Sequence, residues 1–199
     1  MSLATPIPQS AADSLIALPV PSVVQIAGRG RGQLTHPLDG RYGPMDTTAL
    51  RMAVERLIAR TDLSGVKYVV GIPEGGMVPG YVFGSATGLP VVFASLWQPL
   101  GPGVITFSED HDPPQVARKY IYGLSPGDHV IIVEDEVTSG GTVINCVRAL
   151  RAAQIRCDQV AAIYASDDPM LPSRLAAESI QLHVVCFFPK EIGNGLVVR

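Results

Sequence analysis

Short apolar runs recur along this chain, and the segments between them carry apolar residues at helical spacing. The runs are too short for ordinary helices and are apolar on both faces, which is typical of strands buried in a parallel sheet. We predict five strands, at 66–72, 90–95, 129–134, 159–166 and 182–188. We predict helices at 46–61, with Asp46 or Thr47 as N-cap, and at 75–88, 142–154 and 170–179.

This alternation predicts an α/β fold with a doubly wound, mainly parallel five-stranded sheet. In such sheets ligands bind beyond the carboxyl ends of the strands, so function is expected at the strand-to-helix turns. Residues 1–22 are rich in Pro, Ser and Ala and predict an N-terminal arm, while 23–199 predict a single domain. Residues 23–45 predict a small irregular hood, in which GRGRG (28–32) is either a flexible loop or an anion contact.

The segment 96–127 interrupts the alternation and is far longer than an ordinary connection. VITF and ARKYIYG predict a hairpin at its base, and its middle is polar and rich in Pro. It is either a flexible loop that closes over the ligand edge or a surface hairpin without a role. Candidates for an acid/base are four residues of this segment and one of the hood, although a charge run is often only solvated: Glu109, Asp110, His111, Asp112 and His36.

Composition narrows the classes of function. The chain has 199 residues, of which 47% are hydrophobic and 17% charged, as expected for one globular domain. Its net charge of −3 gives no general attraction to nucleic acid, so we expect no nucleic-acid partner. No apolar run reaches the roughly 18 residues of a membrane span, and the N-terminus lacks the features of a signal peptide. The three cysteines are far apart without CxxC spacing, which favours a reduced, cytoplasmic setting.

The stretch VIIVEDEVTSGGT, 130–142, carries the candidate chemistry. Its apolar run predicts a buried strand with Glu134 at its end and Asp135 just past it. The loop that follows leads into a helix N-terminus, a favourable place for a phosphate: Thr138, Ser139, Gly140, Gly141 and Thr142. The acids would repel a phosphate but suit sugar hydroxyls or a metal, and a ribose 5-phosphate would satisfy both halves. Alternatively, the acids cap the helix and the loop is a plain turn.

IIVEDEVTSGGT resembles the phosphoribosyl-pyrophosphate (PRPP) binding motif of the type I phosphoribosyltransferases, and the resemblance extends over roughly residues 35–190. It implies that Glu134 and Asp135 bind the ribose hydroxyls and that the loop 138–142 binds the 5-phosphate. It also implies that the turn in GIPEGGM, 71–77, holds pyrophosphate, with a cis peptide bond at Glu74–Gly75. The pyrophosphate-binding residues would be Glu74, Gly75, Gly76 and Met77.

The sequence is most similar to the adenine and xanthine branches of the family, with the orotate enzymes next, and it departs from the pattern in two places. Where the family has Arg-Lys after the second strand, this chain has 96–98, Leu-Trp-Gln; Arg118 and Lys119 could substitute. Where hypoxanthine-guanine enzymes carry an aspartate base, it has Thr138, so no catalytic residue is assigned. Glu136 occupies a position that is usually apolar in the family.

The resemblance implies transfer of 5-phosphoribosyl from PRPP to a nitrogen heterocycle with release of pyrophosphate. It implies Mg²⁺ bound mainly through PRPP, no assigned protein ligand for the metal, and a homodimer. The alternative is a PRPP-binding regulator or silent paralogue, which the missing Arg-Lys favours and the acidic balance opposes. A hydrolase lacks support, because GxSxG is absent and the cysteines sit in apolar runs or on helix faces.

Overall fold

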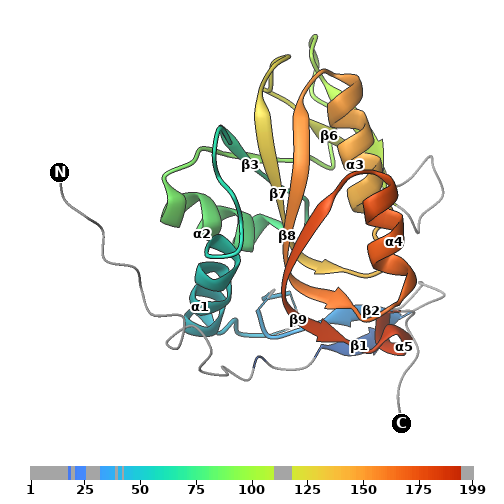
Figure 1. Cartoon of the computed structure of the whole chain (residues 1–199). Helices are drawn as coiled ribbons and strands as arrows, with labels where there is room; N and C mark the ends of the chain where they lie inside the picture. The colour runs from blue at the N-terminus through green and yellow to red at the C-terminus, as the bar shows by residue number, and fades with distance from the viewer. Residues whose placement is uncertain are drawn as a thin grey trace.

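A parallel five-stranded sheet forms the centre of the molecule (Figure 1). The computed structural model describes residues 18, 21–25, 32–38, 40–41, 43–109 and 118–193. The strand order is β4-β3-β7-β8-β9, and all four neighbouring pairs are parallel. The strands are β3 (Tyr68–Gly71), β4 (Val91–Phe93), β7 (His129–Val137), β8 (Arg156–Ser166) and β9 (Gln181–Phe188). The predicted α/β fold class is confirmed.

Helices cover both faces of the sheet, with α1 and α2 on one side and α3 and α4 on the other (Figure 1). They are α1 (Thr47–Ile58), α2 (Met77–Thr87), α3 (Gly141–Ala152), α4 (Met170–Ala177) and the short α5 (Lys190–Gly193). Asp46 is the N-cap of α1, as predicted, and accepts hydrogen bonds from the backbone N–H groups of Thr48 and Ala49 at 3.1 and 2.9 Å. The longest of these helices have 12 residues, and none in the described part of the chain could cross a bilayer.

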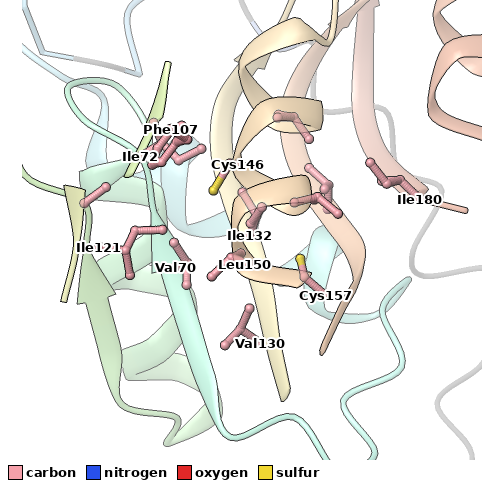
Figure 2. Close-up of a cluster of buried hydrophobic side chains, with 14 of the residues drawn as sticks. Val70, Ile72, Phe107, Ile121, Val130, Ile132, Cys146, Leu150, Cys157 and Ile180 are labelled. Carbon is pink, nitrogen blue, oxygen red and sulfur yellow. The ribbon is translucent and has the colours of Figure 1, made fainter. Parts of the chain in front are cut away.

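The central strand β7 separates two apolar clusters. Val130 and Ile132 pack toward α3, where Cys146 and Leu150 join the same cluster (Figure 2). The neighbouring Ile131 belongs to the second cluster, with residues of α1 and α2. Because both faces of β7 are buried, its apolar run is continuous rather than alternating. The residues after Val133 therefore lie directly beyond the apolar core.

β7 is longer than predicted, and this corrects the expected position of the acids. Glu134 and Asp135 lie within the strand, which ends at Val137, rather than at its end and just past it. The reason is the neighbouring strand: β8 runs to Ser166 and pairs Glu136 with Tyr164 and Val137 with Ala165. Backbone pairing therefore continues through Glu134, Asp135 and Glu136, whose charged side chains did not predict a strand in the sequence.

Two small antiparallel sheets flank the main one. In one of them β1 (Ser22–Gln25) pairs with β2 (Gly32–Thr35), largely within the segment predicted as a hood. The predicted hairpin in 96–127 is confirmed as β5 (Ile105–Ser108) paired with β6 (Arg118–Ile121). Tyr120 of β6 is bridged to Ser95, which holds the hairpin beside the edge of the main sheet.

Several predictions fall on residues that the structure does not describe. They concern Asp110, His111 and Asp112 in the long segment, residues 28–31 of GRGRG, and most of the arm 1–22. Within that arm, Leu18 is described, and it is buried in the cluster shared by the hood and α1. The division into arm, hood and flexible loop stays a prediction.

Candidate functional site

Two strand-to-helix turns lie next to each other at the carboxyl edge of the sheet. β3 and β7 are neighbours, and Gly71 at the end of β3 pairs with Val133. α2 begins six residues after Gly71, at Met77, and α3 begins at Gly141 after β7. The N-termini of both helices therefore open onto the same edge, as predicted for two adjacent anion sites.

The turn after β3 packs against the two acids of β7: Gly75 lies against Asp135, and Gly76 lies against Glu134. A Cβ placed on Gly75 would lie 1.9 Å from Oδ2 of Asp135, and its three nearest atoms all belong to that carboxylate. A Cβ placed on Gly76 would lie 2.4 Å from Oε2 of Glu134. A side chain at either position would collide with the acids, so glycine is required for this close approach. The structure thus brings together the two motifs that the sequence keeps about sixty residues apart.

Asp135 is held by two side chains of the hood. His36 Nε2 lies 3.3 Å from Asp135 Oδ2, and the Arg41 guanidinium donates to the same oxygen at 3.3 Å. The other ring nitrogen of His36, Nδ1, accepts a hydrogen bond from the backbone N–H of Leu38 at 3.3 Å. A nitrogen that accepts has no proton, so in neutral His36 the proton is on Nε2 and is donated to Asp135. The ring is buried against Tyr164, with ring centroids 4.7 Å apart.

Glu134 sits in a different environment from its neighbour. Burial raises the pKa of Glu134 well above its ordinary value of 4.5, and the charges of Asp135 and Glu136 raise this pKa further. The ammonium group of Lys119 acts in the opposite direction, but it is already paired with Glu109, with Nζ and Oε1 2.7 Å apart. The carboxyl group of Glu134 therefore keeps its proton to a higher pH than an exposed glutamate does.

The variant Glu134→Gln should be more stable than the wild type at pH 8, and the difference should shrink toward pH 5. Above pH 4.5 the unfolded chain releases the Glu134 proton while the folded protein keeps it, so stability falls as pH rises toward the folded-state pKa. Within that window the slope from one such group is about 1.4 kcal/mol per pH unit. Calorimetric melting at pH 5 to 8 measures it. Glu55→Gln, at an exposed acid, is the control, and an equal gain for Glu134→Gln at every pH would contradict the assignment.

The predicted phosphate loop follows β7 directly. Gly140 is the N-cap of α3 and has a left-handed φ of 83°, where a Cβ would also meet Leu171 at 2.9 Å. Gly140 has no side chain that could cap the N–H groups of the first turn. Ser139 Oγ accepts from the Gly141 N–H at 3.2 Å, which closes the turn. That this loop binds a phosphate stays a prediction.

Glu136, which the sequence left without a role, lies close to His36 of the hood. Side-chain atoms of His36, Asp135 and Glu136 lie within 4.8 Å of one another, and among the described residues this group has the composition of a metal site. His36 does not fit a metal, because the Leu38 N–H already occupies Nδ1 and leaves the proton on Nε2. The two carboxylates do fit Mg²⁺, which prefers oxygen ligands.

The turn 71–77 differs from the sequence prediction in two respects. The cis peptide bond is Pro73–Glu74 and not Glu74–Gly75. The sequence gives no signal that separates adjacent peptide bonds of this turn. In the same turn the Gly76 N–H donates to the Ile72 carbonyl at 3.0 Å. Glu74 and Met77 are exposed, so they border the turn rather than line its buried part.

Three residues near the site were missed or left open by the sequence. Arg41 gave no signal, because the irregular segment around it has no period. Lys119 was named only as a substitute, and its burial at 4% exposure beside Glu109 was not foreseen. His36 was a candidate acid/base, but its side chain is fully buried and holds Asp135.

The two buried cysteines do not supply a nucleophile. All three are unpaired, and Cys146 and Cys157 are buried. Burial raises the pKa of Cys146 well above its ordinary value and raises the pKa of Cys157 to about 12. Neither thiol is therefore ionised near neutral pH, which removes the thiolate that such chemistry needs.

The chain is similar in sequence to known purine phosphoribosyltransferases. Over 128 residues it is 27% identical to a hypoxanthine/guanine phosphoribosyltransferase of Methanosarcina barkeri, covering 64% of this chain and 67% of that protein. Over 100 residues it is 34% identical to an adenine phosphoribosyltransferase of Synechococcus sp. (strain JA-3-3Ab), covering 49% of this chain and 57% of that protein. The match to the Synechococcus protein thus spans less than two thirds of that protein's length. No family model matches the chain.

The fold is shared with solved phosphoribosyltransferases. The structure of the adenine phosphoribosyltransferase of Giardia lamblia in complex with 9-deazaadenine superimposes with a TM-score of 0.68 at 15% identity, covering 84% of this chain and 93% of that one. The chain therefore has the phosphoribosyltransferase fold. The chain is thus similar in sequence to purine phosphoribosyltransferases and shares the fold of the solved one.

Proposed function

We propose that the protein transfers 5-phosphoribosyl from PRPP to a purine-like nitrogen heterocycle and releases pyrophosphate. One observation carries this proposal: Gly75 and Gly76 fit directly against Asp135 and Glu134. A ribose held by these acids would present its anomeric carbon toward the turn assigned to pyrophosphate, and its 5-phosphate toward the loop 138–142. The names of the relatives support the purine-like acceptor.

In the proposed reaction a ring nitrogen of the acceptor forms a bond to the anomeric carbon of PRPP. The bond from that carbon to the pyrophosphate oxygen breaks, its electron pair leaves with pyrophosphate, and the acceptor nitrogen loses its proton to water or a base. The protein positions the two reactants and stabilises charge. The carboxylate of Asp135, which His36 and Arg41 orient, would accept hydrogen bonds from the ribose hydroxyls.

Mg²⁺ belongs to the proposal as well. It would be held mainly by oxygens of PRPP, with the carboxylates of Asp135 and Glu136 near enough to one another to assist. When bound, it would neutralise charge on the departing pyrophosphate. The protein's own residues supply the orientation of the ribose through Glu134 and Asp135.

The acceptor would lie between the hood and the end of β9. Leu34 and Leu38 of the hood share an apolar cluster with Phe188 at the end of β9, so the two segments meet. Phe187, the residue before Phe188, is 63% exposed and could lie against a flat ring of the acceptor. The hairpin of β5 and β6 carries the long segment that we propose as a flexible loop over this edge.

We further propose a cytoplasmic homodimer. Large apolar side chains are exposed on α2, on the edge strand β4 and on the segment after it: Met77, Tyr81, Phe93, Leu96, Trp97 and Leu100. Trp97 is 84% exposed. Exposed large apolar side chains on neighbouring segments are typical of a protein interface, and light scattering that gave a monomer mass would contradict the homodimer.

A pyrophosphate-release screen tests the function. The protein with Mg²⁺ and PRPP is offered adenine, hypoxanthine, guanine, xanthine, orotate and carboxylated heterocycles, and we expect release with a purine. Silence over the whole panel, with PRPP binding intact by calorimetry, would favour the regulator or silent paralogue instead. Absence of PRPP binding would exclude both.

A further inference from the structure

The predicted phosphate loop is backed by α4, the helix between β8 and β9. A Cβ placed on Gly140 would lie 2.9 Å from Cδ1 of Leu171 and 3.5 Å from Cδ2 of Leu175. Three residues after Leu171, and therefore on the same face of α4, the guanidinium of Arg174 donates a hydrogen bond to the backbone carbonyl of Ser139 at 3.3 Å. α4 thus contacts two consecutive residues of the loop, one through apolar side chains and one through a cation.

The peptide between Ser139 and Gly140 decides which backbone group the loop presents to a ligand. Gly140 has a left-handed φ of 83°, and glycine populates both signs of φ, so this peptide can rotate with little steric resistance. Rotation by half a turn would exchange the Ser139 carbonyl for the Gly140 N–H, and a carbonyl facing a phosphate would repel it. The next carbonyl, that of Gly140, is held within α3 because it accepts from the Ile144 N–H at 2.9 Å.

We propose that Arg174 is a positioning residue that fixes this peptide for the 5-phosphate of PRPP; this rests on the proposed function. The peptide Ser139–Gly140 is trans, and in a trans peptide the carbonyl and the N–H point in opposite directions. Because Arg174 holds the carbonyl on the side of α4, the Gly140 N–H points away from α4. In the strand order β3-β7-β8-β9, α4 connects the last two strands, whereas the acids lie in β7 and the turn 71–77 follows β3. This direction therefore leads from α4 toward the proposed substrate.

A cation on the carbonyl also strengthens the donor at the other end of the same peptide. A hydrogen bond to a carbonyl polarises the peptide unit, and a charged donor does so more than a neutral one. Arg174 would act in this way without contacting the phosphate, because it lies on the carbonyl side of the peptide. The hydrogen bond is exposed and 3.3 Å long, so we expect a modest effect on binding.

The place of Arg174 is secured by the packing of α4 at its beginning and along its apolar face. Asp168, just before α4, is buried, and its Oδ1 accepts from the Met170 N–H at 3.0 Å and from the Lys190 ammonium group at 3.2 Å. Lys190 follows β9, so the beginning of α4 is tied to the end of that strand. The apolar face of α4 belongs to the same buried cluster as α3. Arg174 thus extends from a fixed helix to the loop.

Calorimetric binding to the whole chain, with Mg²⁺ present, tests the proposal. Arg174→Met removes the donor and keeps the aliphatic stem, so it should weaken PRPP and ribose 5-phosphate alike by about threefold to tenfold. Pyrophosphate binding, measured with ribose 5-phosphate at saturation, should stay unchanged. Arg174→Lys, which keeps a charged donor, should recover part of the loss. Arg148→Met is the matched control: this exposed arginine of α3 pairs with Glu178 at 2.5 Å rather than with the loop.

The outcomes separate this proposal from the function on which it rests. Unchanged binding of ribose 5-phosphate in Arg174→Met would overturn the proposal, as would a loss that Arg174→Lys does not reduce. An equal loss in Arg148→Met would show a general effect of positive charge and would overturn it as well. Equal losses of ribose 5-phosphate and pyrophosphate would show a general loosening of the site, again against the proposal. A wild-type chain that binds neither PRPP nor ribose 5-phosphate would overturn the proposed function together with this inference.

Discussion

Replacing both acids of the central strand, Glu134→Ala with Asp135→Ala, should weaken binding of PRPP and of ribose 5-phosphate alike. A neutral hydrogen bond contributes about 0.5–1.5 kcal/mol and one to a charged group about 1.5–3 kcal/mol, so the loss of the contacts to Glu134 and Asp135 is expected to weaken binding by about 30-fold to 10³-fold. Both ligands are affected because both contain the ribose that these acids would hold. Titration calorimetry in the presence of Mg²⁺ measures the two affinities.

Loss of folding must be separated from loss of binding in this experiment. Removing Glu134 relieves a buried acid, but removing Asp135 deprives His36 and Arg41 of their shared acceptor. The pair Glu134→Gln with Asp135→Asn keeps the size of both side chains and some hydrogen-bonding capacity, so it should stay folded and still bind weakly. Unchanged affinity in either double variant, with an intact melting transition, would refute the assignment of ribose to these acids.

Much of the site could be predicted because its parts carry strong local signals. The apolar run before Glu134 specifies a buried strand, and the glycines after Ser139 allow the tight entry into α3. The parallel alternation of strands and helices then places both turns at one edge of the sheet, since the carboxyl ends of parallel strands coincide. These features depend on residues close in the sequence, or on a regular pattern.

The remainder depends on contacts between distant segments. The sequence ended the strand at Glu134, because charged residues rarely continue a buried run, whereas pairing of Glu136 with Tyr164 extends it. Likewise, nothing around His36 or Arg41 indicates that they meet Asp135, which lies 99 and 94 residues away. In both cases a long-range contact, which has no local signature, decides where a charged group finds its partner.

The close fit between Gly75 and Asp135 leads to the second prediction with a large effect. Gly75→Ala would place its Cβ 1.9 Å from Asp135 Oδ2 and 2.2 Å from Cγ, so the carboxylate must move away from His36 and Arg41. We expect a loss of about 1–3 kcal/mol in stability from the forced shift, and at least a tenfold loss of PRPP affinity, which is about 1.4 kcal/mol. Gly43→Ala is the control, because a Cβ there has no atom within 4 Å.

Introducing Gly75→Ala into an Asp135→Ala variant tests whether the collision with Asp135 causes the loss of stability. The three atoms nearest to the added Cβ all belong to Asp135, so in an Asp135→Ala background the collision disappears. Gly75→Ala should then cost little additional stability, and the two substitutions should be strongly non-additive, as expected for residues in direct contact. Chemical denaturation of the wild type, both single variants and the double variant measures this coupling. Additive losses would mean that Gly75 is needed for its backbone conformation, and that the turn and the acid pair are not fitted to each other.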